Sequence, residues 1–258
     1  MEFISVDANL RASFRILAEG RPPGEIREFP GVFIAHAGVT FQMFNAAFLS
    51  APVGDELELA RRISQAAVFF QARGTPWSFW VTQGWLSAEL RRRSRTIFQR
   101  HHLRHVSEMP GMVADTLPPP GRGLPSLDVL RVFNEQSRRA FCELGSSCFN
   151  VPHTWFKEVF DTGPIWEQFR GYVGYANGEP IATAAVVAAS DVLGVYNVAI
   201  LPGWQRRGYG EAIMRAALDD TRRQHPIERT ILQSTMQGLG LYLRLGYRTV
   251  TKIDVYAS

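Results

Sequence analysis

The sequence predicts a mixed α/β (α+β) fold in two parts. A chain of 258 residues that is 46% hydrophobic and 12% aromatic can bury one large core or two modest ones. Helix-length segments alternate with short runs rich in β-branched and aromatic residues. A proline-rich stretch at 117–125 divides the chain, because consecutive prolines exclude both helix and sheet interior. We therefore expect domains at residues 1–116 and 125–258, joined by a linker.

Charge and cysteine content exclude several classes of protein. Lys and Arg total 28 and Asp and Glu 24, a formal charge of +4 that suits an anionic small ligand as well as nucleic acid. Cys142 and Cys148 are too few for a disulfide framework and lack the paired spacing of a zinc site. No run approaches the roughly 20 apolar residues of a membrane span, and the start has no signal-peptide pattern. We expect a soluble cytoplasmic protein with two buried thiols, no metal and no membrane partner.

The sequence of the first part predicts alternating strands and helices and contains no motif that indicates a particular chemistry. Residues 31–35 and 77–81 are rich in β-favouring side chains and predict strands, whereas residues 55–73 predict a helix. Ser87 is a suitable N-cap for a further helix that would run towards His105.

The second part carries a clear hairpin signal. Asn177-Gly178 favours a type I′ turn because both residues tolerate positive φ, so the strand at 171–176 should return antiparallel at 181–189. Helices are predicted at 127–144, 154–160, 209–223 and 239–245, and further strands at 195–201, 230–235 and 247–256.

The segment at 202–211 has the composition of an anion-binding turn. It lies where a strand leads into a helix, whose first amides have no internal partner and carry about half a positive charge from the helix dipole. Gly208 and Gly210 have no side chain, so the backbone can approach a diphosphate closely. Arg206 and Arg207 add positive charge.

Two motifs together resemble the GNAT superfamily of acyl-CoA-dependent N-acyltransferases. Gln205, Gly208 and Gly210 match the superfamily's cofactor motif of Gln or Arg, two residues, Gly, one residue, and Gly or Ala. Residues 241–242 (Leu-Tyr) and 245–247 (Leu-Gly-Tyr) match its second signature, in the expected order and spacing. The resemblance covers about residues 125–258.

This resemblance implies a mixed, mostly antiparallel sheet flanked by helices and splayed between the strands at 195–201 and 230–235. Acetyl-CoA, or a close acyl-CoA relative, would lie in that cleft as acyl donor, its pantetheine pairing with backbone groups of Val198 and Ile200. Thr235 stands where many members have an Asn that contacts pantetheine. The implied cofactor site comprises Val198, Ala199, Ile200, Gln205, Arg206, Arg207, Gly208, Tyr209, Gly210, Glu211 and Thr235.

The same resemblance implies direct attack of an acceptor amine on the thioester, with Tyr242 as the catalytic residue. A phenol with an ordinary pKa of about 10 is protonated at neutral pH and can give a proton or a hydrogen bond to the departing thiolate. Both cysteines precede the hairpin, away from the expected thioester position, so no covalent enzyme intermediate is expected. Glu167, Glu179 and Asp191 are near the strands, but none is assigned as the general base.

Residues 1–116 resemble a degenerate second copy of the GNAT fold. The stretches 98–103 and 110–113 are similar to the closing helix and strand of such a domain, but no two-glycine anion turn precedes them. We therefore expect this part to wall the acceptor pocket and to bind no CoA itself.

Several conspicuous side chains have simpler explanations. His101, His102 and His105 could share a helical face, but interleaved arginines favour a solvated basic surface over a metal site. The tryptophans Trp77 and Trp80, together with the more distant Trp85, are expected to pack in the core rather than to line a pocket.

Two alternative functions remain open at this point. The absence of an obvious base allows a non-catalytic acyl-CoA-binding regulatory module, and the arginine run at 91–95 allows nucleic-acid binding, which we do not favour. The acceptor, the acyl chain length and the oligomeric state are not indicated by the sequence.

Overall fold

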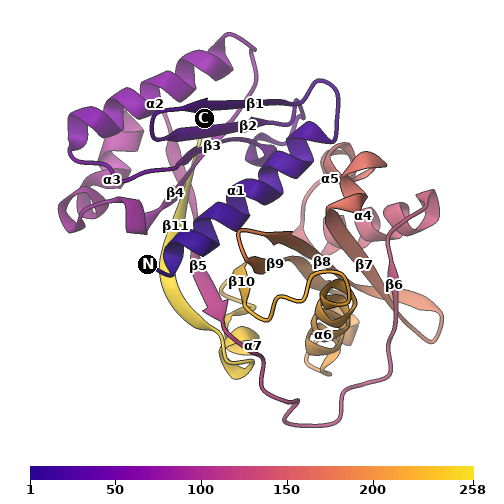
Figure 1. Ribbon diagram of the computed structural model, residues 1–258. Helices are drawn as coiled ribbons and strands as arrows, with labels where there is room; N and C mark the ends of the chain where they lie inside the picture. The colour runs from indigo at the N-terminus through magenta and orange to yellow at the C-terminus, as the bar shows by residue number, and fades with distance from the viewer.

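A computed structural model describes residues 1–258, and all of its strands join one sheet (Figure 1). The sheet has eleven strands in the order β1-β2-β3-β4-β11-β5-β10-β9-β8-β7-β6. The strands are β1 (Glu25–Phe29), β2 (Val32–His36), β3 (Asn45–Leu49), β4 (Ser78–Thr82), β5 (Arg104–Ala114), β6 (Asp128–Arg131), β7 (Phe169–Ala176), β8 (Glu179–Ala189), β9 (Val192–Ile200), β10 (Thr230–Gln233) and β11 (Arg248–Ala257). The helices are α1 (Phe3–Glu19), α2 (Glu56–Gln71), α3 (Ala88–Arg100), α4 (Glu135–Phe149), α5 (His153–Phe160), α6 (Tyr209–Arg222) and α7 (Leu239–Arg244).

The sheet is mixed and mostly antiparallel, which confirms the predicted fold class. Only two neighbouring pairs, β3 with β4 and β9 with β10, run parallel. A parallel pair needs a crossover, and α2 and α6 supply it in the two halves of the chain. The predicted hairpin is present as well, with Asn177 and Gly178 at φ +53° and +80° between β7 and β8.

Two strands are exchanged between the halves. β11 lies between β4 and β5 of the first half, and β5 lies between β11 and β10 of the second. The series β1-β2-β3-β4-β11 therefore mirrors β7-β8-β9-β10-β5 across the centre of the sheet. Each half of the chain thus contributes one strand that pairs with the strands of the other half. The division into two domains stays a prediction.

Helices cover both faces of the sheet. Residues that alternate along the strands pack on α2, α3, α6 and α7 at one face, and on α1, α4 and α5 at the other. The predicted core tryptophans Trp77, Trp80 and Trp85 are all buried, but Trp80 also lines a cavity, against the expectation that none of them would. The proline-rich stretch runs around one edge of the molecule from β5 to β6 (Figure 1).

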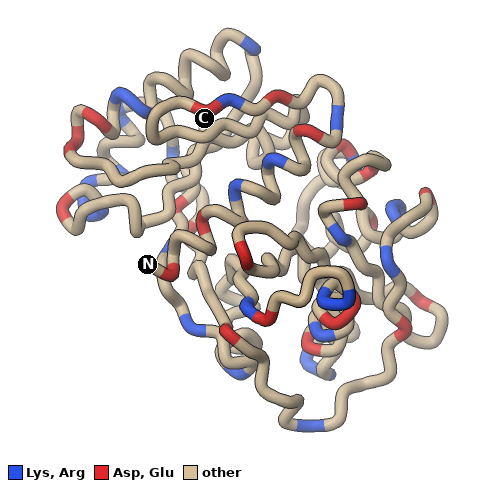
Figure 2. Tube along the Cα trace, in the orientation of Figure 1, with Lys and Arg blue, Asp and Glu red and all other residues tan.

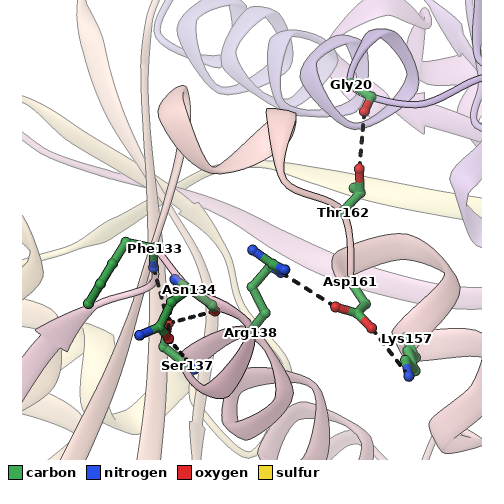
Figure 3. A network of polar contacts seen from close by, with 8 residues as sticks. All are labelled: Gly20, Phe133, Asn134, Ser137, Arg138, Lys157, Asp161 and Thr162. Carbon is green, nitrogen blue, oxygen red and sulfur yellow. Dashed lines mark hydrogen bonds and ion pairs between the residues drawn. The ribbon is translucent and has the colours of Figure 1, made fainter.

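Polar contacts join α4, α5 and α1 (Figure 3). Asp161 follows α5 and lies 3.5 Å from Nε of Arg138 and 3.3 Å from Nζ of Lys157. Next to it, the Thr162 hydroxyl donates to the carbonyl of Gly20 at the end of α1, at 3.3 Å. These bonds hold the two short helices against the first half of the chain.

The predicted helix at 127–144 is wrong in its first eight residues. Residues 128–131 form the edge strand β6, because Val129 and Arg131 face inwards while Asp128 and Leu130 face solvent, a period of two. The helix starts only at Glu135, after a capping box between Asn134 and Ser137 (Figure 3).

The predicted helix from Ser87 also ends early. Ser87 accepts a hydrogen bond from the Leu90 amide as expected for an N-cap, but α3 stops at Arg100. His102 then takes a left-handed φ of +61°, and β5 begins at Arg104. The three histidines consequently share no helical face.

Candidate active site

β9 and β10 separate after three residue pairs. Their parallel ladder runs from Leu193 opposite Thr230 to Val195 opposite Leu232, and no pair follows. At Asn197, with φ +49°, β9 has one residue more than β8 opposite it, a bulge that bends the strand. The predicted splay between these strands is present, and beyond Val195 it leaves one edge of β9 unpaired.

The turn from β9 into α6 presents a row of unpaired backbone amides. Arg206 and Gly208 take left-handed conformations, with φ of +61° and +97°. No amide from 206 to 211 donates a hydrogen bond within the protein, and no side chain caps α6. Six successive donors at the positive end of a helix dipole form a strong site for an anion.

Four of these six residues, Arg206, Gly208, Gly210 and Glu211, line a cavity of about 1430 Å³. Ten of the twelve predicted site residues line it: Val198, Ala199, Ile200, Gln205, Arg206, Gly208, Gly210, Glu211, Thr235 and Tyr242. Arg207 and Tyr209 do not line it, because both contact Trp204 instead. The Arg207 guanidinium lies 5.6 Å from the centre of the Trp204 ring. The Tyr209 ring packs edge-on against the same ring, with 5.4 Å between the ring centres.

A side chain at either glycine of the turn would press on a neighbouring residue. A Cβ on Gly208 would lie 3.0 Å from Cδ of Pro125, and one on Gly210 would lie 3.2 Å from a methyl group of Leu241. Gly208 also has a positive φ, a backbone conformation that glycine adopts without the strain that a side chain would cause. The linker thus packs directly on the turn.

Gln205 and Thr235 already have partners in the protein. The Gln205 side chain donates to the carbonyl of Ile200 at 3.0 Å, which ties the turn to the end of β9. The Thr235 hydroxyl accepts from the Gly238 amide at 3.1 Å and so fixes the turn into α7, while its proton stays available to a ligand.

Tyr242 on α7 lies in the cavity wall. Its hydroxyl makes no hydrogen bond within the protein, although only 8% of the residue is exposed. Burial raises the pKa of Tyr242 to about 12, because the low-polarity surroundings disfavour the phenolate. The side chain is therefore a neutral hydrogen-bond donor at physiological pH.

Further polar residues reach the cavity that the sequence alone did not indicate. Arg122 of the linker, Arg215 of α6 and Arg244 of α7 add cationic groups around the turn. The amide nitrogens of Asn197 and Gln233 are buried without a partner at the point where the strands separate. Arg215 follows Glu211 by four residues, a spacing in the sequence that places both on one helical face. Nothing in the sequence around Arg122 indicates that this linker residue reaches the cavity.

Candidate bases and nucleophiles are scarce at this site. Glu211 is the only carboxylate that lines the cavity, and it pairs with Arg215 at 2.9 Å. Glu167, Glu179 and Asp191 lie outside it.

The two thiols differ from the expected buried pair. Cys142 is buried, but Cys148 is only half-buried and lines the cavity. Burial raises the pKa of the Cys142 thiol to about 12 and also raises that of Cys148, so both are poor nucleophiles at neutral pH.

The structure has neither a metal-binding cluster nor a helix that could span a membrane. No group of three His, Cys, Asp or Glu side chains is arranged to hold a metal ion. None of the helices combines the length and the apolar character that crossing a bilayer requires.

Part of the chain matches a known domain family. Residues 167–249 match the family model described as an acetyltransferase (GNAT) domain. No curated protein matches the chain.

Solved structures share the fold of the whole chain. A GCN5-related N-acetyltransferase from Kribbella flavida superposes with a TM-score of 0.71 at 16% identity, over 96% of this chain and 94% of that one. A functionally unknown conserved protein from Staphylococcus epidermidis gives 0.64 at 11% identity, over 92% and 95%. A GCN5-related N-acetyltransferase from Sphaerobacter thermophilus gives 0.59 at 14% identity, over 88% and 76%.

Proposed function

Residues 167–249 form a GNAT acetyltransferase domain, and from this premise we propose that the chain transfers an acetyl group from acetyl-CoA to an amine. The observation that carries the proposal is the row of six unpaired amides from 206 to 211 beside a large cavity. The CoA diphosphate would accept these hydrogen bonds, and Arg206, Arg122 and Arg244 would supply balancing charge.

Pantetheine would run from this turn along the unpaired edge of β9. Val198 and Ile200 lie beyond the last pair with β10, so their backbone groups on that side, apart from the Ile200 carbonyl that already accepts from Gln205, can bond to an extended ligand as a further strand would. Two further polar groups face the same cavity. The unpaired side-chain nitrogen of Gln233 faces it from the end of β10, and Thr235 faces it from the turn that follows β10. A buried donor without a partner costs about 1–3 kcal/mol, which a ligand oxygen here would recover.

Transfer would proceed by direct attack. The neutral amine nitrogen forms a bond to the thioester carbonyl carbon, the C–S bond breaks, and the electron pair leaves on sulfur. The nitrogen loses one proton and the thiolate gains one, with water carrying the proton because no free carboxylate lines the cavity. Tyr242, with a pKa raised to about 12, would stabilise the departing thiolate mainly by donating a hydrogen bond.

The first half of the chain would wall the acceptor end of the cavity. Leu10, Phe14 and Leu17 of α1 line it together with Trp80 of β4 and with Phe41, Met43 and Phe44. Two unpaired cysteines suit a reducing, cytoplasmic location, which is part of the proposal.

Nucleic-acid binding has less support. Figure 2 shows basic and acidic residues interspersed along the backbone of both halves. On α3, Arg93 and Arg100 both pair with Glu56, so part of the arginine run is neutralised within the protein.

Calorimetry with CoA, followed by a thiol-release assay with acetyl-CoA and a panel of amines, tests the proposal. We expect one CoA per chain and amine-dependent thiol release. CoA binding without release for any amine would instead support the regulatory module, and no CoA binding would contradict both.

A further inference from the structure

The cavity has a second end, remote from the amide row, whose walls are aromatic. Consecutive ring centroids lie 5.1 to 6.1 Å apart along a series that crosses from the first half of the chain to the second. The series is Trp80, Phe14, Phe44, Phe160, Phe169 and Tyr196, all of which line the cavity. Because Tyr196 lies on β9 next to the open edge, the rings extend from the proposed thioester position outwards.

No charged side chain lines this aromatic end. The charged residues of the cavity are Arg122, Arg206, Glu211, Arg215 and Arg244, and all of them belong to the linker, the turn, α6 or α7. A second ammonium group or a carboxylate on the acceptor would therefore lose its hydration without gaining a partner.

Three polar side chains at this end already have partners. The Tyr196 hydroxyl donates to Asn9 at 2.7 Å, the Trp80 indole donates to Ser78 at 2.9 Å, and the Ser13 hydroxyl donates to the Leu10 carbonyl at 2.8 Å. These groups create no demand for a polar ligand, so the surface offered to an acceptor is apolar.

The volume leaves room for a second ligand. Pockets for single small ligands hold about 300–1,000 Å³, whereas this cavity measures about 1430 Å³. Acetyl-CoA along β9 would fill only the end beside α6.

We infer that the acceptor is an amine borne on a bulky apolar group, with an aromatic ring as the best fit, and this inference rests on the proposed N-acyltransferase function. The apolar group would lie among the rings and point the nitrogen towards the thioester. Removal of the amine from water favours its neutral form, which is the form that attacks, and so lessens the need for a general base. The proton released on forming the N–C bond balances the one taken up by the CoA thiolate.

Binding of simple amines to the CoA-loaded protein tests this inference without requiring turnover. Isothermal titration would compare 2-phenylethylamine with ethylamine, which lacks only the ring, and with spermidine and glutamate, which carry further charges. Burial of the phenyl group should strengthen binding about 10- to 100-fold relative to ethylamine. Equal or tighter binding of ethylamine, spermidine or glutamate would overturn the inference.

A bulky substitution on the apolar wall provides a second test. Cys148→Trp fills space at the aromatic end and should weaken 2-phenylethylamine binding at least tenfold while CoA binding persists. Met43→Trp, from the other wall, serves if the first variant does not fold. Leu57→Trp, at a position 80% exposed on α2, controls for the added ring.

The outcomes separate the two proposals. Failure of the unmodified protein to bind CoA would contradict the proposed function. CoA binding with unchanged 2-phenylethylamine affinity in the folded Cys148→Trp and Met43→Trp variants would contradict the acceptor inference alone.

Discussion

The starts of α2 and α6 occupy equivalent places in the two halves, yet their backbone amides meet different partners. Both helices follow the first strand of a parallel pair. At α6 the amides are unpaired. At α2, Asp55 accepts from the Glu58 amide at 2.8 Å, and the Glu58 carboxylate accepts from the Gly54 amide at 2.8 Å. The protein's own carboxylates thus occupy the place that a diphosphate would take.

The strands next to the two helices differ in the same way. After β3, the Val53 amide donates to the Trp85 carbonyl at 2.9 Å, and Val53 forms a parallel bridge with Leu86. The first half is therefore closed where β9 and β10 are open. The comparison teaches that one topology can leave backbone amides and a strand edge unpaired in one half of the chain and pair them within the protein in the other.

The largest effect is expected from Gly208→Val, which should weaken CoA binding by about 100-fold or more. Valine is strained at the positive φ that this position adopts, and its side chain would obstruct the amide row. The loss of two or more hydrogen bonds to a charged ligand costs about 1.5–3 kcal/mol each. Calorimetry measures the change, circular dichroism checks the fold, and Gly54→Val at the start of α2 is the matched control. Unchanged CoA affinity in a folded Gly208→Val protein would refute the assigned diphosphate site.

Next in size, Tyr242→Phe should lower kcat about 100-fold with little change in CoA affinity. The substitution keeps the ring in the cavity wall and removes only the donor to the leaving thiolate. Steady-state kinetics and CoA titration give the two readouts. Full turnover would show that Tyr242 only packs.

Removal of the α2 cap separates stability from binding. Asp55→Ala should lower the free energy of unfolding by about 1 kcal/mol, the usual worth of an N-cap. CoA stoichiometry should stay at one per chain, because the bridge at Val53 still closes the neighbouring strands. Denaturant unfolding and calorimetry measure both quantities, and a second equivalent of CoA would contradict the comparison.

The smallest effect should come from salt. Raising the ionic strength should weaken CoA binding several-fold, since the amide row and the surrounding arginines act through charge. Binding of 2-phenylethylamine at the apolar end should change much less. Equal salt sensitivity of the two ligands would argue against a division of the cavity into charged and apolar ends.

Local chemistry made much of the site predictable. Gln205, Gly208 and Gly210 carry constraints that act within a few residues, namely a turn, a positive φ and a helix start, so their positions follow from the sequence. Arg207 and Tyr209 were expected at the ligand but contact Trp204, because side-chain direction depends on the finished packing.

The pairing of strands that lie far apart in the chain could not be predicted from the sequence. Nothing local in β5, which even contains Pro110, shows that it pairs with both β10 and β11. α1 was missed although Val6, Leu10 and Phe14 share a buried face, because the buried polar residues Asp7 and Asn9 interrupt the apolar pattern.

The exchange of β5 and β11 also sets an order of events during protein synthesis. β4 is complete at Thr82, but the strand that pairs with its open edge ends at Ala257, 175 residues later. At a translation rate of about 5–20 residues per second, this interval lasts roughly 10 to 35 s. During that time β4 and β5 are on the nascent chain with unpaired edges, to which other chains can add. The first half can therefore close only after the second half has been synthesised.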